Sequence, residues 1–394
     1  MTTIDPAPPP SAAAGGHERA AIAALATVAF VLNLNTNVLG AVLPFARGDL
    51  ALDGTGERYL IGAGALGAAI GALALNVLVR RLGQRAVLLG GLIGFAVLSV
   101  GHVLPPTWWP FLLLRFGSGL AVGVAYAAAS GFAAEVAPYA RRGRAMGMFT
   151  AGMFLAIPIG MPLAVLLGKA GHWQWIFLVQ AALAVLGALW VRRVVPEAAA
   201  VPRVHLFGVL FEPGVLATLL ATMLHVGSFF TTVQLATSWL DSSGIVAKDD
   251  QLLVWVGLGV ASVLGSALLG RLSDRVGKRN FVLMTSAALV LCFGLLAQEP
   301  RGLELLLLGT LLAATAAART GPLQALLSGL VAKARVPALM GLRGFSMQLG
   351  VVLFAGAAAQ LPADGGFRAV LLLAAVCQLL SYVVIRTGAR ERAA

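Results

Sequence analysis

The chain has 394 residues, of which 59% are hydrophobic and only 11% are charged, and its mean hydropathy is +0.90. A soluble globular domain carries about 25% charged residues, so this composition excludes an ordinary soluble fold. The formal net charge of +12 raises the question of a nucleic-acid partner, but the basic residues lie in short loops between apolar stretches. The apolar run over 303–308 shows no alternation of polar and apolar residues, which excludes a transmembrane β-barrel.

The first half of the chain begins with a polar segment over 1–19 that is rich in Pro, Ala and Gly. This segment has no signal-peptide pattern, and we expect a disordered cytosolic tail. Apolar stretches long enough to cross a bilayer follow, because about 20 helical residues span its hydrocarbon core. The predicted spans of this first bundle, which extends over 20–195, are 20–43, 59–79, 86–103, 111–134, 146–167 and 175–195.

A basic linker over 196–213, which contains prolines, separates these spans from a second set in 214–386. The second set is predicted at 215–240, 252–269, 281–297, 303–323, 338–361 and 367–385, followed by a short cytosolic tail over 387–394. Cys292 and Cys377 fall inside spans, so we interpret them as apolar residues and expect neither a disulfide nor a metal site.

The distribution of Lys and Arg predicts the orientation. Twenty of these residues lie in tails and loops on the side of the chain ends, and six lie in the opposite loops. Positive residues stay on the side from which insertion occurs, so both termini are predicted to be cytosolic in a multi-pass membrane protein of bacterial inner-membrane type. This explanation of the basic excess requires no nucleic-acid partner.

The two halves contain an internal repeat. LVRRLGQRAVLL aligns with LSDRVGKRNFVL through Gly83 and Gly277, 194 positions apart, and a second pair of segments aligns through Gly143 and Gly341, 198 positions apart. Both separations are close to half the chain length. The repeat predicts an all-α membrane protein of twelve transmembrane helices in two pseudo-symmetric six-helix bundles, with a binding site between them.

At these residues the sequence resembles the major facilitator superfamily. The match to the cytosolic loop motif of that family consists of Gly270, Asp274, Arg275, Gly277, Lys278 and Arg279. Further matches are the fourth-span residues Arg115, Gly119, Gly123, Glu135, Pro138, Arg142 and Gly143, and WQWIF from Trp173. The resemblance is strongest to the twelve-span drug and sugar efflux branch. It implies secondary active transport of a small organic molecule by alternating access, in a monomer within the lipid bilayer, without enzymatic activity or cofactor.

The chain departs from the pattern of that family in its first half. The first loop has Arg80 where the motif has an aspartate and Asn76 where it has a glycine, and the fifth-span antiporter motif is incomplete around Gly152 and Pro158. The incomplete motif weakens the expectation of proton-coupled antiport but does not exclude this mechanism.

The loop motifs predict a cytosolic gate. Asp274 is expected to face the N-terminus of the fifth span, where helix N–H groups attract an anion, whereas Arg80 is expected to meet the eleventh span unfavourably. Glu135 is expected to pair with Arg81 or Arg85. The complete candidate gate is Gly270, Asp274, Arg275, Gly277, Lys278, Arg279, Arg81, Arg85, Glu135 and Arg142. The alternative is that these charges only orient the loops.

The predicted membrane interior contains two charged residues, Arg115 and Arg319, and no carboxylate. Charged groups inside a membrane are costly and point to function, so both are candidates for substrate binding or coupling. The alternatives are that Arg115 hydrogen-bonds carbonyls within the bundle and that Arg319 snorkels toward the cytosol. An interior without carboxylates favours an anionic or neutral polar substrate over a lipophilic cation.

Span seven carries a polar stripe on one helix face: Thr218, Thr222, His225, Ser228 and Thr232. Such a stripe is expected to line an aqueous cavity, with His225 as a candidate proton carrier. The alternatives are that the hydroxyls bond their own helix and that the histidine is an uncharged hydrogen-bonding group.

Span one contains a second polar group. Asn33 and Asn37 share a face and are cavity candidates, whereas Asn35 points elsewhere. Their alternative role is to join helices by hydrogen bonds. Weaker candidates, which are polar residues in apolar spans, are Tyr126, Gln180, Gln348 and Gln378.

One nucleotide-binding pattern is rejected. The glycines of G-x-G-x-x-G over 62–67 lie within an apolar helix, and Gly67 and Gly71 indicate close helix packing. The sequence contains no P-loop, zinc spacing or nucleophile elbow, so we expect no catalytic residue and no metal ligand. The remaining alternatives to export are a nutrient importer or uniporter of the same fold, and a transport-inactive sensor or assembly factor.

Overall fold

The computed structural model describes residues 12–51, 54–104, 108–196, 206–246, 251–361 and 366–389. Within these ranges the chain is helical and contains no strand. Eleven of the described helical segments are long and apolar enough to cross a membrane. The helix Gly54–Leu82, which contains a shorter apolar stretch over Gly62–Leu75, lies among them as a twelfth. The predicted all-α membrane fold is therefore confirmed.

The first half comprises α1 (Ala12–Ala46), α2 (Gly54–Leu82), α3 (Gln84–Gly101), α4 (Trp108–Val136), α5 (Tyr139–Phe154), α6 (Met161–Lys169) and α7 (Trp175–Val194). The second half comprises α8 (Leu206–Leu210), α9 (Val215–Ser243), α10 (Gln251–Val276), α11 (Lys278–Leu296), α12 (Leu303–Ser328), α13 (Val336–Ala359) and α14 (Gly366–Gly388). Membrane-length helices satisfy their backbone groups internally, which lipid requires.

The fifth span is interrupted. A π-helical segment, η1 (Ala156–Gly160), separates α5 from α6 and contains Pro158. Proline has no N–H to donate and crowds the preceding turn, which favours such a local rearrangement. The helix also begins at Tyr139, seven residues before the predicted start at 146, because its first turns carry arginines outside the apolar stretch.

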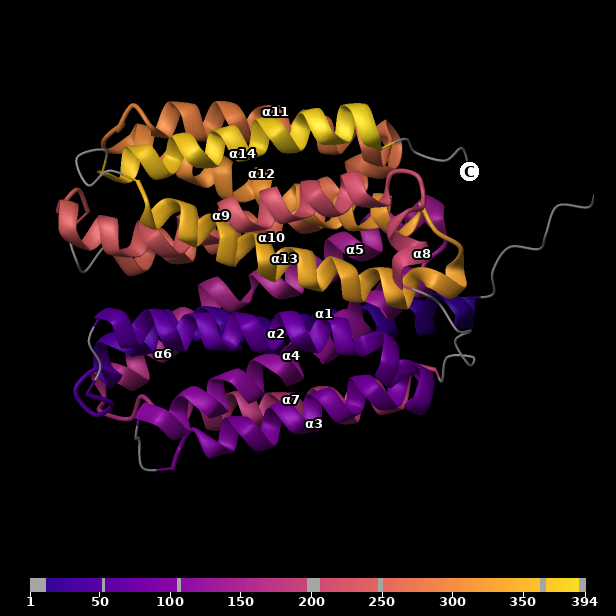
Figure 1. Ribbon diagram of the computed structural model, residues 1–394, viewed down its shortest axis with the longest axis horizontal. Helices are drawn as coiled ribbons and strands as arrows, with labels where there is room; N and C mark the ends of the chain where they lie inside the picture. Colours follow the sequence, from indigo (N-terminus) through magenta and orange to yellow (C-terminus); the bar gives the residue numbers. More distant parts are fainter. Residues whose placement is uncertain are drawn as a thin grey trace, which may run out of the picture.

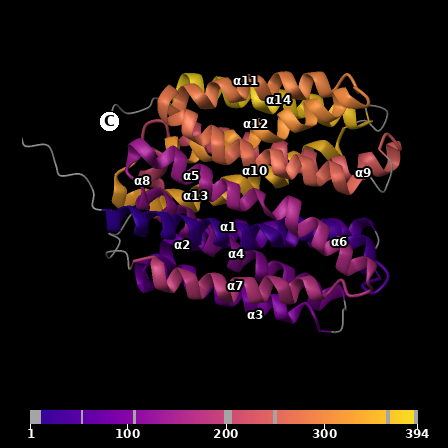
Figure 2. The same ribbon diagram turned by 180° about the vertical axis from the view of Figure 1, so that it is seen from behind.

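The helices form two bundles side by side (Figure 1). The view from behind shows the same division, with α1–α4 and α7 in one layer and α9–α14 in the other (Figure 2). Helix α5 lies between the layers and packs on α1 of its own half and on α10 and α12 of the other, while α6 packs on α1, η1 and α7. The described chain ends lie at one end of the molecule, on the right of Figure 1. We call this the Asp274 end and the opposite one the far end.

Glycines set the closest helix contacts. A Cβ on Gly67 would lie 2.1 Å from the carbonyl oxygen of Phe116, and one on Gly71 would lie 2.1 Å from that of Leu120. Real Cβ atoms do not approach backbone so closely, so α2 and α4 meet only because these positions are glycine. The rejected nucleotide pattern lies in the helix interior of α2, as expected.

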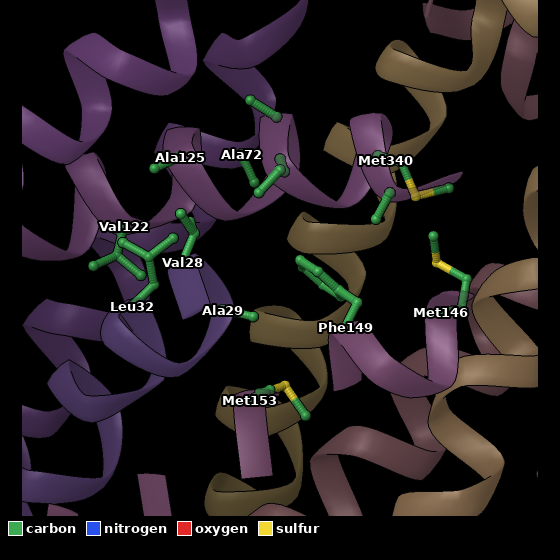
Figure 3. Packing of buried hydrophobic residues seen from close by; sticks show 14 of the residues in the cluster. Val28, Ala29, Leu32, Ala72, Val122, Ala125, Met146, Phe149, Met153 and Met340 are labelled. Atoms are coloured by element: carbon green, nitrogen blue, oxygen red, sulfur yellow. The ribbon is translucent and has the colours of Figure 1, made fainter. Parts of the chain in front are cut away.

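A shared apolar core crosses the boundary between the halves. Met146 and Phe149 of α5 and Met340 of α13 are all buried in it. Figure 3 shows these three side chains gathered where α5 meets the second half. Flexible methionines suit such a boundary, because they fill irregular space between helices.

Candidate functional site

The two repeated loops, α2–α3 and α10–α11, have the same backbone turn. Gly83 and Gly277 each precede a helix with positive φ, 82° and 92°, which only glycine adopts without strain. Two positions later, Arg85 donates to the carbonyl oxygen of Arg192 at the end of α7. Its counterpart Arg279 donates to the carbonyl oxygens of Arg386 (2.8 Å) and Ala389 (2.6 Å) at the end of α14. Each loop thus fastens the last helix of its own half.

Asp274 makes a contact that its counterpart does not. Its carboxylate accepts hydrogen bonds from the backbone N–H groups of Gly143 (3.1 Å) and Arg144 (3.0 Å), in the first two turns of α5. Lys278 forms an ion pair with the same carboxylate at 3.3 Å and is itself buried. A carboxylate near a helix N-terminus is favoured by the helix dipole, so Asp274 joins the second half to the first. We call this contact the Asp274 latch.

The latch depends on small residues. A Cβ on Gly143 would lie 2.4 Å from the Oδ1 atom of Asp274, and one on Gly147 would lie 2.7 Å from the carbonyl oxygen of Ser266. The Ser266 hydroxyl donates to the carbonyl oxygen of Gly147 at 2.9 Å, and Gly270 is buried beside both glycines. Helices α5 and α10 therefore meet backbone to backbone at this end.

The other predicted gate residues occupy different places. Arg142 donates to the Ser328 hydroxyl at 3.2 Å, which is a further hydrogen bond between the halves. Glu135 is half-buried near the end of α4. The side chains of Arg80, Arg81 and Arg275 are exposed.

Arg343 is a site residue that the sequence analysis missed. It was counted with the loop charges, but it lies within α13 and is only 1% exposed. Its guanidinium lies close enough to the Tyr126 hydroxyl of α4 to interact with it electrostatically. The same hydroxyl lies 3.3 Å from the Met153 sulfur, and Tyr126 also packs on Phe149. The signal for Arg343 was its place five residues inside the predicted span over 338–361.

Arg343 and Tyr126 therefore form a polar contact between the halves, inside the membrane layer. Further toward the far end, Phe154 stacks on Phe230 of α9, with ring centroids 5.9 Å apart. A Cβ on Gly259 of α10 would lie 2.5 Å from Pro158, which shows how closely η1 approaches the second half. These contacts extend from the Asp274 end to η1.

The predicted candidates on α1 lie beside this seam. Asn33 donates to the carbonyl oxygen of Met153 at 2.8 Å, and Asn37 donates to that of Asn33 at 2.9 Å. Both are partly exposed, and Thr36 and Gly40 on the same helix face are exposed. A Cβ on Gly40 would meet no atom within 4 Å.

Arg115, by contrast, lies inside the first bundle. It is 3% exposed and donates to the side-chain oxygen of Asn35 at 2.7 Å and to the backbone oxygen of the same residue at 3.2 Å. Asn35 points away from the Asn33 face, as expected, and that is why it reaches α4. Gly64 of α2 leaves room for the guanidinium.

Arg319 and His225 lie inside the second bundle and are also buried. Arg319 donates to the hydroxyls of Ser286 (3.1 Å) and Ser381 (2.7 Å). The His225 ring nitrogens lie 3.3 Å from the side-chain oxygen of Gln378 and 3.4 Å from the Thr320 hydroxyl. Both candidates therefore make these hydrogen bonds within the second half, and none of the bonds is to Tyr126 or Asn33.

The hydroxyls of the α9 stripe mostly bond their own helix. Thr218 donates to the carbonyl oxygen of Gly214 (2.7 Å), Thr222 to that of Thr218 (2.8 Å) and Ser228 to that of Leu224 (2.7 Å). Thr232, which is also buried, has a side-chain oxygen without a hydrogen-bond partner. Among the residues described, no cluster of three or more His, Cys, Asp or Glu side chains is arranged to hold a metal ion.

Comparisons with known proteins place this arrangement in a family. A probable sugar efflux transporter of Helicobacter acinonychis (strain Sheeba) is 26% identical over 282 residues, covering 70% of this chain and 71% of that protein. A putative metabolite transport protein, YncC of Bacillus subtilis (strain 168), is 36% identical over 159 residues, covering 39% of this chain and 34% of that protein.

Two solved structures share the fold. The proton:xylose symporter XylE bound to 6-bromo-6-deoxy-D-glucose has a TM-score of 0.77 and 15% identity, with 94% of this chain and 95% of that chain covered. The human organic anion transporter MFSD10 has a TM-score of 0.70 and 18% identity, with 93% of this chain and 99% of that chain covered. A sequence model of the Major Facilitator Superfamily matches residues 25–298 and 246–393. The chain belongs to the Major Facilitator Superfamily and is a membrane transporter.

Proposed function

We propose that this transporter exports a small neutral or anionic polar molecule across a bacterial inner membrane by alternating access, with both termini in the cytosol. The observation that carries the proposal is the Asp274 latch. In this latch, Asp274 of α10 binds the N-terminal part of α5 and so joins the two halves at one end of the molecule. Rocking of two bundles about a central site requires contacts that close one end and break when the other closes. In this proposal the Asp274 end is the cytosolic gate.

The polar groups near the seam support this substrate class. Asn33 and Asn37 offer uncharged hydrogen-bonding groups on a partly exposed face of α1, and polar groups exposed in a membrane span favour a cavity over lipid. Tyr126 lies near this face, because its hydroxyl contacts the sulfur of Met153, whose carbonyl oxygen accepts from Asn33, and Arg343 is its neighbour across the seam. A neutral polyol or sugar fits amides and a phenol, and a buried guanidinium adds attraction for an anion.

Arg115 and Arg319 have structural roles in this proposal. Each donates to uncharged oxygens of its own half, and each is almost completely buried. A buried cation held by several hydrogen bonds stiffens the surrounding helices, but it is not positioned to meet a substrate between the halves. Tyr126 and Arg343 therefore replace them as the principal binding candidates, with Asn33 and Asn37.

Export is proposed because of the sugar efflux relatives, since the described contacts are compatible with movement in either direction. If the export is driven by protons, His225 is the candidate carrier, because the membrane interior offers no carboxylate in the described helices. Its hydrogen-bonding neighbours Gln378 and Thr320 are uncharged, and the guanidinium groups of Arg319 and Arg343 are near enough to interact with it electrostatically.

The test is counterflow in proteoliposomes of the purified protein. Panels of sugars, organic anions and lipophilic cations are preloaded in turn, with and without an imposed pH gradient, and empty liposomes are the control. We expect exchange of a sugar or organic anion, and loss of at least about 90% of it in Arg343→Gln or Asn33→Ala. Exchange of lipophilic cations alone would exclude the proposed substrate class.

The same assay separates the alternatives. A pH gradient that drives accumulation in the uptake direction would indicate an importer, and exchange unaffected by any gradient would indicate a uniporter. If no substrate is exchanged and none shifts the thermal midpoint, a transport-inactive sensor or assembly factor replaces the proposal, because a ligand stabilises the state that it binds.

A further inference from the structure

A cavity separate from the polar seam lies in the second half toward the far end. It measures about 280 Å³, is partly open, and is lined mainly by α9, α10, α12 and α14, with Leu296 of α11 and with Ile157 of η1 as the contribution of the first half. Its aromatic walls include Trp239 and Phe367, which stack with ring centroids 4.8 Å apart. Trp255 forms another wall. Tyr126, Arg343, Asn33 and Asn37 are absent from the lining, whereas Thr232, the last residue of the polar α9 stripe, belongs to it.

The lining of the cavity is mainly apolar and includes a buried hydroxyl group without a hydrogen-bond partner. None of the described lining residues is charged. Thr232 lines the cavity, is 3% exposed, and its hydroxyl has no hydrogen-bond partner. Leaving a buried hydroxyl unpaired is unfavourable, so a molecule that bonds it gains affinity. The other hydroxyl in the lining, that of Ser262, already donates to the carbonyl oxygen of Leu258 at 2.9 Å.

The volume of the cavity limits the size of the molecule that can bind in it. A dry cavity of about 150 Å³ accepts a benzene molecule, so 280 Å³ accepts a ring with a short substituent, roughly ten non-hydrogen atoms. Aromatic walls favour a flat ring, because offset and edge-to-face ring contacts add to simple burial. A charged ligand would lose its hydration without gaining a partner.

We propose that this cavity is a binding site for a small neutral ring compound with a single hydroxyl group, such as an aryl alcohol, which exchanges a hydrogen bond with Thr232. The site goes beyond the proposed export of a polar molecule, because its walls exclude a polyol. The same apolar chemistry is found in a lipid acyl chain, so the experiment must distinguish a free small molecule from a lipid.

The experiment uses the full-length protein in phospholipid nanodiscs and a neutral aryl alcohol carrying a photoreactive diazirine. Labelled positions are mapped by peptide mass spectrometry. We expect labels on α9 and α12, with competition by 2-phenylethanol and at least tenfold weaker competition by phenylacetate and benzyltrimethylammonium. Absence of label from the lining, or equal competition by the charged compounds, would overturn the proposal.

Matched variants test the geometry. Gly309 lines the cavity, and a Cβ there would meet only the Leu258 side chain at an ordinary 3.4 Å. Gly309→Leu is therefore expected to fill the cavity and reduce labelling at least fivefold. Gly294→Leu on α11, where a Cβ meets no atom within 4 Å, is the control and should label normally. Equal labelling in the two variants contradicts the site.

The hydroxyl and the lipid are tested separately. Thr232→Val is expected to weaken competition by 2-phenylethanol about fivefold and to leave ethylbenzene unchanged, whereas equal changes for both contradict the hydrogen bond. Labelling of the same strength in nanodiscs and in delipidated detergent supports a free small molecule. Labelling that appears only after lipid is removed would assign the cavity to an acyl chain and overturn the proposal.

Discussion

The two repeated loops, one in each half, share one function and differ in another. Arg85 and Arg279 both donate to carbonyl oxygens at the end of the last helix of their own half. Only the second loop also reaches across the seam, because Asp274 accepts two backbone hydrogen bonds from α5 while Arg80 in the first loop is exposed. Fastening within a bundle is therefore symmetric, whereas the latch between the bundles is on one side only.

The largest effect is expected when the latch is removed by Asp274→Ala. The change deletes two hydrogen bonds to a charged acceptor and leaves Lys278 buried without its ion pair, a loss of about 2–3 kcal/mol for the closed arrangement. That loss shifts the population of the closed end about 30- to 160-fold. We expect transport to fall at least about tenfold, measured as initial rate in proteoliposomes.

Cysteine labelling measures in which direction the population shifts between the two ends being closed. A cysteine introduced by Thr36→Cys, with Cys292 and Cys377 changed to serine, reports access from the far end, since Thr36 is exposed on α1. Opening of the Asp274 end is expected to reduce its labelling by an impermeant thiol reagent. Asp274→Asn, which keeps one acceptor oxygen, should be milder. Unchanged labelling in both variants would mean that the latch does not control the gate.

An effect on stability, with no direct effect on the latch, is expected when the first loop receives the buried lysine of the second. Gln84 is the counterpart of Lys278, is 1% exposed, and has no carboxylate at the position of Arg80. Gln84→Lys would bury a cation without a partner and is expected to lower the stability by about 3 kcal/mol. The measurement is chemical or thermal unfolding in detergent.

The control for this variant restores the missing partner. Adding Arg80→Asp to Gln84→Lys supplies a carboxylate four residues earlier, as in the second loop, and should recover at least half of the loss. If the double variant is no more stable than Gln84→Lys, the two loops are not equivalent at these positions.

A further comparison tests the hydrogen bonds that the two loops have in common. Arg85→Ala and Arg279→Ala each remove charge-assisted hydrogen bonds to the end of α7 or α14, which contribute about 2 kcal/mol. We expect similar falls in the free energy of unfolding, within about 1 kcal/mol of each other. A fall confined to one variant would show that only one half depends on this fastening.

The sequence is sufficient to predict features that depend on local pattern. Apolar length gives the spans, and the repeat gives the two bundles, because each bilayer-spanning segment must be a helix. Gly67 and Gly71 predict close packing of α2, and the contact with α4 confirms it. The proximity of Asp274 to α5 follows from the aligned loops together with the known family pattern.

Contacts between residues that lie far apart in the sequence cannot be predicted from the local sequence pattern. The sequence shows that Asn35 faces away from Asn33, but not that Arg115, 80 positions later, meets it. Arg343 resembles a loop arginine in a count of charges, and only the packing of α13 on α4 directs it to Tyr126. The sequence likewise gives no indication that Gln378 accompanies His225 across 153 positions.

The smallest effect is expected for Arg80→Ala, and it is informative for that reason. From the sequence, Arg80 was expected to oppose the N-terminus of the eleventh span, so its removal would have stabilised the closed end. Instead its side chain is exposed, while α13 approaches α2 through Gly341 and Ala72. Mutation of an exposed charged residue that lies outside such helix contacts rarely changes the free energy of unfolding by more than about 0.5 kcal/mol. Transport and far-end labelling of Thr36→Cys should therefore stay within about twofold of the parent. An increase in closed-end population would instead show that the first loop repels α13 and that the asymmetry of the latch is partly electrostatic.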